Sequence, residues 1–230
     1  MAPRRMAARR REVTVQAGEF TIKPSESERL LGIKIHQSMS WNHHVRDAEG
    51  SVLKQLITRV NGLRKLTQKA SFKTKLMIAN GIVISKLTYG LAMWGNCQAY
   101  LKKALQVQQL TAAQAVCGYR SFYWSTAKLL STCGWLSVNQ LYWQQVYTTT
   151  HKILLSQKPI NIHGRMVARH QHHTRAAAGV SRGFGNLIVS TSFNHSATSY
   201  NHLPANIREA RNMKEFKRAI KDWIQKNISL

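Results

Sequence analysis

Two histidine clusters are the residues in this sequence that come closest to a metal-binding pattern. His43 and His44 are adjacent, and a second cluster reads His170-x-His172-His173. Neutral imidazoles bind zinc or copper, but a stable site needs third and fourth ligands at fixed spacing and acceptors behind them. No cysteine flanks either cluster, and no acidic residue lies near the second one. We therefore expect no metal site and no cofactor, and interpret the histidines as surface residues or phosphate contacts.

The positions of the acidic residues exclude most catalytic chemistry. All 9 Asp and Glu residues lie at or before Glu49, or at or after Glu209, so residues 51–208 contain none. That interval cannot hold a carboxylate pair, a two-metal centre or a histidine oriented by its own carboxylate. Neither aspartate of the chain, Asp47 or Asp222, stands beside another acid. We therefore expect that the isolated chain is not an enzyme.

The three cysteines do not form a recognisable metal or redox motif. Cys97, Cys117 and Cys133 are widely separated, and no Cys-x-x-Cys pair occurs. Cys117 and Cys133 each precede a glycine and follow an apolar helical pattern. Reduced thiols packed in the core are the simplest expectation for such positions.

The excess of positive charge is the strongest signal in the composition. The chain has 34 Lys and Arg against 9 Asp and Glu, a formal net charge of +25. Such an excess suits polyphosphate partners or an anionic membrane surface. The stretch closest to a membrane span, residues 76–95, carries Asn80 and Lys86 near its middle, so we expect a buried helical segment and no membrane contact. Solvated faces normally mix both signs, so the basic faces favour phosphates of RNA, DNA or an RNA–DNA hybrid.

The first residues differ from the rest of the chain. Residues 1–11, MAPRRMAARRR, contain arginines but no acid, and we assign them to a basic flexible arm. A mitochondrial transit peptide is similarly rich in arginine. This arm is short and lacks serine, so we favour a nuclear or cytoplasmic location over a mitochondrial one.

Residues 12–45 have the pattern of a small antiparallel sheet. Residues 12–24 alternate apolar and polar side chains around Ala17-Gly18, which predicts a β-hairpin. RLLGIKI, residues 29–35, predicts a third strand. Gly32 within it indicates a bulge or the close approach of another backbone.

The pattern then becomes helical. Residues 46–157 repeat apolar side chains at helical spacing, and we expect helices over 52–66, 71–86, 99–117, 126–135 and 137–157. Residues 158–205 are rich in His, Arg, Gly and Ser, which predicts an irregular basic connector. Residues 206–230 predict a C-terminal amphipathic helix, with Asn212 as its cap and Glu215 three residues later. The fold class is therefore mainly α, with a small N-terminal antiparallel sheet followed by a multi-helix bundle.

Five segments of the chain carry a resemblance to a known family when they are taken in order. They are RLLGIKIHQSMSWNHHV (29–45), LRKL with FKTKLMIANGIVISKLTYGLAMWG (63–95), LQVQQLTAAQAVCG (105–118), LLSTCGWLSVNQLYW (129–143) and SYNHLPANIREARNMKEFKRAIKDWI (199–224). In this order they resemble the C-terminal part of the reverse transcriptases of non-LTR retrotransposons. The first segment resembles the signature that follows the catalytic palm, the second resembles the helical thumb, and the others resemble the blocks that follow. Tyr200 stands where the last block usually has tryptophan.

The resemblance implies roles for specific residues. Leu31 and Gly32 match the primer-grip turn, where backbone approaches the primer end, and glycine suits such an approach. The helices from 50 to about 95 match the thumb, whose basic face follows the template–primer backbone. Trp41, His43 and His44 are expected to position the sheet against the thumb. The expected nucleic-acid contacts besides Leu31 and Gly32 are Arg59, Arg64, Lys65, Lys69, Lys73 and Lys75.

Two functions from different classes remain open on the sequence. The first is a truncated reverse-transcriptase-like fragment that lacks the catalytic palm and binds template–primer backbones without sequence preference. In the family the palm carries the catalytic aspartates, so an active enzyme would require a palm-containing polypeptide supplied in trans. The second is a structural or protein-interaction module, since a missing palm would leave an apolar face exposed.

Overall fold

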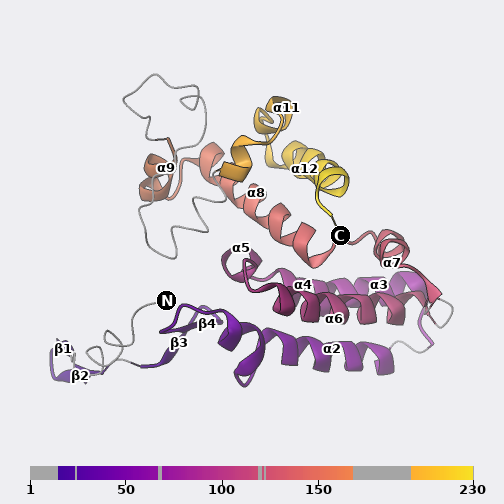
Figure 1. The fold of residues 1–230 in the computed structure, drawn as a ribbon, viewed down its shortest axis with the longest axis horizontal. Coiled ribbons are helices and arrows are strands. Elements are labelled where there is room, and N and C mark those ends of the chain that lie inside the picture. The colour runs from indigo at the N-terminus through magenta and orange to yellow at the C-terminus, as the bar shows by residue number, and fades with distance from the viewer. Residues whose placement is uncertain are drawn as a thin grey trace.

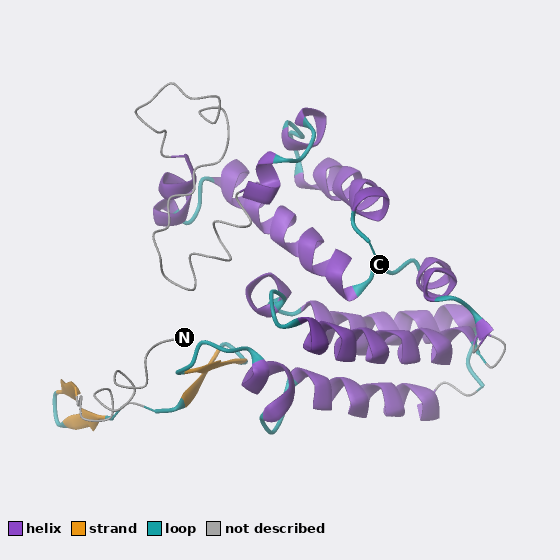
Figure 2. Cartoon of the chain, viewed as in Figure 1, coloured by secondary structure: helices purple, strands orange, loops and turns teal. Residues whose placement is uncertain are grey.

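The computed structural model describes residues 15–23, 25–66, 69–118, 121, 123–167 and 198–229 (Figure 1). Short strands lie at the N-terminal end, and helices make up most of the rest (Figure 2). The predicted fold class, mainly α with a small antiparallel β region, is confirmed. None of the helices in these ranges has the length and apolarity that crossing a membrane requires.

The β region consists of two separate hairpins, not one three-stranded sheet. β1 (Val15–Ala17) pairs with β2 (Phe20–Ile22), as the pattern of residues 12–24 predicts. β3 (Ser27–Leu30) pairs with β4 (Ile33–His36), with Leu30 opposite Ile33. Residues 29–35, which we expected to form a single strand, therefore contain a complete reversal of the chain.

The reversal occurs at Leu31 and Gly32, both of which have positive φ, 48° and 79°. Two central residues with φ > 0 match the twist of a tight two-residue hairpin. Glycine adopts this conformation easily, whereas leucine at φ 48° is strained. Gly32 thus marks a turn instead of the bulge we expected. Its neighbour is a side chain, because a Cβ built on Gly32 would lie 3.7 Å from Cε1 of Tyr89.

A π-helical turn, η1 (His43–Asp47), connects the second hairpin to α2 (Val52–Leu66). The apolar stripe of α2 faces the core, since Val52, Leu56, Val60 and Leu63 are all at most 2% exposed. α2 packs against α6 (Ala99–Cys117), the long helix beside it in Figure 1.

The helix expected over 71–86 is present but contains a π-helical turn. α3 (Phe72–Ala79), η2 (Asn80–Ile84) and α4 (Ser85–Thr88) follow without a break, and α5 (Leu91–Trp94) comes after the turn at Gly90. The amide oxygen of Asn80 accepts a hydrogen bond from the indole of Trp135, at 2.8 Å. One face of the apolar stretch 76–95 is buried, since Ala79, Val83, Leu87, Leu91 and Trp94 are 0% exposed. Met77, Tyr89 and Met93 are 68%, 53% and 53% exposed, so the predicted burial holds for that face alone.

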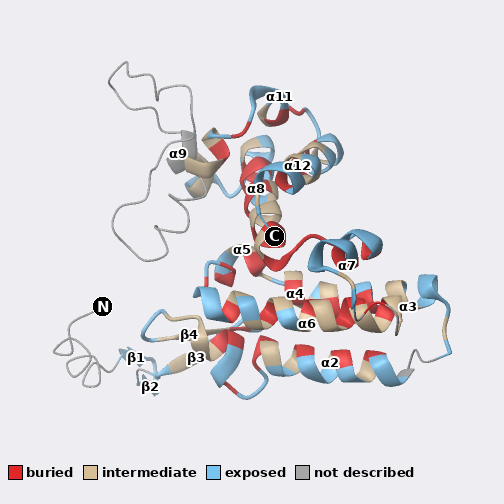
Figure 3. Cartoon of the chain, turned by 45° about the vertical axis from the view of Figure 1, so that its right-hand side comes forward, coloured by how far each residue is buried: buried red, intermediate tan, exposed pale blue. Residues whose placement is uncertain are grey.

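Two further helices lie within one or two residues of the ranges expected from the sequence, 126–135 and 137–157. α7 (Thr126–Cys133) ends at Gly134, which adopts the left-handed conformation of a C-cap. α8 (Val138–Ser156) begins with a capping box, in which Ser137 and Gln140 bond to each other's backbone N–H. Figure 3 shows that the buried residues concentrate where α2, α6 and α8 face other helices.

The C-terminal region is more helical than predicted. α9 (Ile160–Val167) lies within the expected irregular connector, so that prediction is wrong for its first residues, and residues 168–197 lie outside the described ranges. The C-terminal segment forms α11 (Ala205–Arg208) and α12 (Met213–Asn227). Asn212 caps α12 as predicted, its Oδ1 accepting from the Glu215 N–H at 2.9 Å.

Candidate nucleic-acid interface

Five of the predicted phosphate contacts gather where α2 ends and α3 begins. Arg64 and Lys65 lie in the last turn of α2, Lys69 in the connection, and Lys73 and Lys75 in the first turns of α3. We call these residues the α2–α3 corner. All except half-buried Lys75 are exposed.

The helix ends reinforce the positive potential at this corner. Ser71 caps α3, its hydroxyl accepting from the Thr74 N–H at 3.3 Å, and the first turn of α3 contains no acidic residue. The positive end of the α3 dipole therefore adds to the charges of Lys69 and Lys73. Anions bind readily where uncompensated helix N–H groups and cations coincide.

A polar row leads from the corner back along α2. Lys54, Thr58, Asn61 and Lys65 recur at helical spacing and are all exposed, opposite the buried stripe of the helix. A strand of nucleic acid lying along α2 could therefore contact Lys54 as well as the corner. The sequence prediction did not include Lys54.

Arg59 has an intramolecular partner. Its Nη1 donates to the carbonyl oxygen of Ile82 at 2.7 Å, which joins α2 to the π-helical turn of the next helix. Guanidinium has five N–H donors, so the others remain able to bind an anion. Arg59 thus has a packing role, and its role as a phosphate contact stays a prediction.

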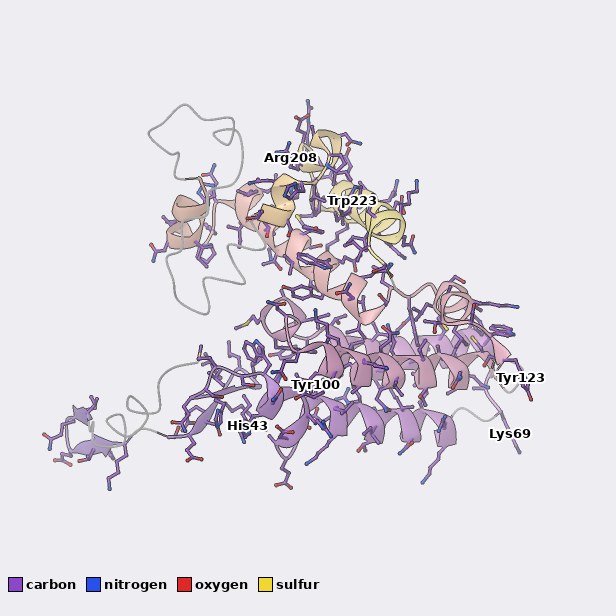
Figure 4. All side chains as sticks on the ribbon, viewed as in Figure 1. His43, Lys69, Tyr100, Tyr123, Arg208 and Trp223 are labelled. Atoms are coloured by element: carbon purple, nitrogen blue, oxygen red, sulfur yellow. The ribbon has the colours of Figure 1, made fainter. Side chains whose placement is uncertain are left out.

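The remaining predicted residues lie at the opposite end of α2. Trp41, His43 and His44 precede this helix, and Leu31 and Gly32 form the hairpin turn beside Tyr89. A helix of 15 residues is about 22 Å long. Figure 4 shows His43 and Lys69 near opposite ends of the helix. The structure therefore divides the predicted residues into two groups, not one continuous site.

Trp41, His43 and His44 lie at the contact between hairpin and helices, where a positioning role was predicted. His43 stacks on His36 with ring centroids 4.0 Å apart. His44 is buried, and its ring meets Trp41 and Trp94 edge-on at 6.4 and 5.6 Å. Its Nδ1 accepts a hydrogen bond from the Lys34 N–H at 3.1 Å, which ties β4 to η1.

Aromatic side chains lie at the same end of the molecule as the α2–α3 corner (Figure 4). Tyr123 is 87% exposed, and Figure 4 places it at the same end of the molecule as Lys69. Trp124 is half-buried under Lys128, whose Nζ lies 4.5 Å from the ring centroid. An exposed tyrosine beside lysines can stack on a base while the lysines bind phosphates.

The thiols and histidines of the described ranges have no arrangement suited to metal chemistry. No group of three or more His, Cys, Asp or Glu side chains that could hold a metal ion occurs there. Cys117 and Cys133 are free, with their sulfurs 3.7 Å apart, and burial raises the pKa of the Cys133 thiol to about 12. Cys133 and Cys97 are buried as predicted, whereas Cys117 is half-buried.

Two sequence features fall outside the described residues. One is the cluster His170-x-His172-His173, for which no metal was expected. The other is GVSRG at 179–183, which has the Gly-x-Ser-x-Gly spacing of a hydrolase nucleophile and was not among the predicted sites.

Several cations that the sequence prediction left out occupy notable positions. Arg29 on β3 and Lys86 on α4 act electrostatically on each other, although they are far apart in sequence. α12 also carries a series of basic residues, Lys214, Lys217, Arg218, Lys221 and Lys226. The available signal for Lys86 was its position as the charged residue within an otherwise apolar stretch.

Comparisons of this chain with family models, curated proteins and solved structures find no match.

Proposed function

We propose that this chain binds the phosphate backbone of RNA, DNA or an RNA–DNA hybrid without sequence preference, as a reverse-transcriptase-like fragment without the catalytic palm. The observation that carries the proposal is the α2–α3 corner. Its exposed cations adjoin a helix N-terminus whose first turn holds no acid, and residues 51–208 contain no acid that could neutralise them. Lysine and arginine that neutralise phosphates release counterions, which drives binding to any sequence.

Fluorescence anisotropy with labelled duplexes tests this proposal. We expect the logarithm of the binding constant to fall linearly with the logarithm of salt concentration, by about 0.7 to 0.9 per phosphate contacted. The triple variant Arg64→Gln, Lys65→Gln, Lys69→Gln removes three corner charges and should reduce this slope by about 2 to 3. The loss should be equal across unrelated sequences, because the corner contacts phosphates instead of bases.

A matched variant on α12 separates a defined interface from general charge attraction. Lys214, Lys217 and Lys226 are exposed as well, so Lys214→Gln, Lys217→Gln, Lys226→Gln removes the same charge elsewhere. The proposal requires a clearly smaller effect from this control. Equal losses of affinity from both triple variants would show that binding is spread over the whole surface. A binding constant that does not change with salt concentration would contradict the proposal outright.

One observation favours the second candidate, a protein-interaction module. Leu30, Leu31, Tyr89 and Met93 are 59%, 81%, 53% and 53% exposed. The Tyr89 hydroxyl donates to the Leu31 carbonyl at 2.7 Å, so the hairpin turn and the α4–α5 turn present one apolar surface. Light scattering separates the candidates. A monodisperse monomer that binds duplexes supports the first function, and an oligomer indifferent to nucleic acid supports the second.

A further inference from the structure

Lys86 has two cationic neighbours that come from two other elements, a strand and a helix. We call Arg29 on β3, Arg59 on α2 and Lys86 on α4 the junction cluster. The carbonyl that Arg59 contacts, that of Ile82, lies one helical turn before Lys86. Because residues four apart share a helix face, the Arg59 guanidinium lies on the face from which Lys86 projects.

Arg29 reaches the same region from the strand. Its Nη2 lies 3.5 Å from the position that a Cβ on Gly50 would take, in the turn that leads into α2. The side chain therefore extends from β3 over the start of that helix. Cross-strand pairing sets Arg29 opposite Lys34, which adds a fourth positive charge on the hairpin nearby.

The charges within the cluster repel one another. Lys86 is partly buried, and its pKa is lowered by that burial and then by the charges of Arg59 and Arg29. Both of these neighbouring groups are cations, and α4 lies in the interval without acids. His44, on which Lys86 and Arg29 also act, is neutral at pH 7 because burial lowers its pKa to about 4.

No carboxylate is among the charged groups that shift the pKa of Lys86. Glu28 precedes Arg29 on β3, but successive strand residues point to opposite faces, so its carboxylate lies on the other face of the hairpin. Asp47 and Glu49 are exposed on the turn before α2.

Mutual repulsion of this kind costs stability in the free protein and is relieved when an anion binds between the charges. Two guanidinium groups offer planar forks that match phosphate oxygens, and the lysine adds a compact point charge. Phosphate is therefore the ligand chemistry that fits the cluster best.

We propose that the junction cluster is a second phosphate-binding site, occupied by a backbone phosphate of the same nucleic-acid strand that the α2–α3 corner binds. The claim that a nucleic-acid strand fills this site rests on the proposed function. The claim that the cluster binds an anion does not depend on it. Its test therefore has two parts.

The first part asks whether the cluster binds phosphate, with pyrophosphate as the probe. Lysines are reductively methylated with ¹³C-formaldehyde, which keeps their charge, and Lys86→Arg assigns the Lys86 signal. Pyrophosphate should shift the Lys86 signal saturably and raise its apparent pKa. Arg29→Gln, a change at an exposed residue, should abolish most of the shift. A Lys86 shift no larger than those of the α12 lysines would overturn the site.

The second part asks whether nucleic acid fills the site. In duplex-binding titrations, Lys86→Gln and Arg29→Gln should each reduce the salt slope by about 0.7 to 0.9, one phosphate contact. Lys214→Gln on α12 is the matched control. If the salt slope of these variants equals that of the wild type, the cluster does not bind a phosphate of the duplex, even if it binds pyrophosphate. A wild-type chain that binds no duplex would overturn the proposed function and this assignment, while the pyrophosphate result still decides the anion site.

Discussion

At the scale of single residues, His44 shows how a buried polar group connects the hairpin to the helices. Its Nδ1 accepts from the Lys34 N–H, so the ring proton of the neutral form is on Nε2. Nε2 is buried without a hydrogen-bond partner and lies among indole rings. A buried donor of this kind has a cost, and protonating the ring would add an unpaired buried charge beside Lys86 and Arg29.

The environment of His44 predicts acid sensitivity. Burial, with smaller contributions from Lys86 and Arg29, lowers its folded-state pKa to about 4 from the ordinary value of 6.5. The unfolded chain therefore binds the proton first as pH falls, and stability conferred by neutral His44 is complete above pH 6.5 and lost between about 6.5 and 4. The loss is on the order of 3 kcal/mol for a shift of this size.

Replacing His44 with glutamine tests that sensitivity. The glutamine amide can still accept from the Lys34 N–H but cannot be protonated, so His44→Gln should flatten the pH dependence of unfolding below about 6.5. Urea unfolding followed by tryptophan fluorescence at several pH values measures this, and each protein is compared with itself at neutral pH. Because burial also lowers the pKa of His151, the wild-type-minus-variant difference is the relevant quantity. Parallel pH profiles for the two proteins would contradict the prediction.

Sequence patterns could indicate which single residues carry charge but not which of them meet. The corner residues are neighbours in sequence, so their proximity was predictable. Arg29, Arg59 and Lys86 come from three elements, and the effect of the two arginines on Lys86 depends on the packing of a hairpin against two helices. The partner of Arg59, a backbone carbonyl, is not visible in any side-chain pattern.

At the scale of elements, helices with clear capping residues at their ends were predictable. α7 ends at a glycine with φ 67°, and α12 starts at an asparagine cap, each a local signal. The second hairpin was missed because its turn uses Leu31, a residue with no turn preference, held in place by contact with Tyr89. The π-helical turns were missed because the spacing of apolar residues does not distinguish an α-helical turn from a π-helical turn, which contains one more residue. Asn80 and Arg59 stabilise one of these turns through tertiary contacts.

The attachment of α12 to α8 depends on a compact aromatic contact. Phe216 is 0% exposed and stacks on His151 at a centroid distance of 3.8 Å. The same histidine bonds the Tyr200 hydroxyl at 2.7 Å and the Ala210 carbonyl at 3.2 Å. Tyr200 therefore supplies a polar link between α8 and the C-terminal segment.

Truncating Phe216 should destabilise this attachment. We expect Phe216→Ala to lower the free energy of unfolding by about 3 to 5 kcal/mol, because it removes a fully buried ring and leaves a cavity. Lys217→Ala, at an exposed position of the same helix, is the control and should change it by less than about 0.5 kcal/mol. Urea unfolding gives both values. A loss below about 1 kcal/mol for Phe216→Ala would show that α12 is not part of the cooperative core.

At the scale of the whole molecule, the position of charge along α2 matters more than its total. The +25 net charge suits the polyanionic ligand that we propose but does not say how that ligand lies on the protein. Arg29 of the junction cluster reaches the turn before α2, whereas the corner lies at the far end of this helix, which is about 22 Å long. Arg59 lies between them, near the middle of the helix. Successive phosphates of one strand are about 3.4 Å apart along a duplex, so this span corresponds to about seven base pairs.

This geometry predicts how affinity depends on duplex length. RNA hairpins with one common loop and stems of about four, seven, ten and fourteen base pairs should bind increasingly tightly up to about seven. Beyond that length only the statistical gain from extra positions should remain, since no further cations are engaged. Anisotropy at one fixed salt concentration measures the series.

Variants at the two ends should change this length dependence differently. Arg29→Gln with Lys86→Gln should abolish the gain between four and seven base pairs while leaving the shortest stem unaffected, because that stem reaches only one end. The corner triple variant should weaken every stem. Two results would contradict this arrangement. One is a shortest stem that binds as tightly as the ten-base-pair stem, and the other is a junction variant that keeps the full length dependence. Either result would show that the two groups of cations do not bind one strand together.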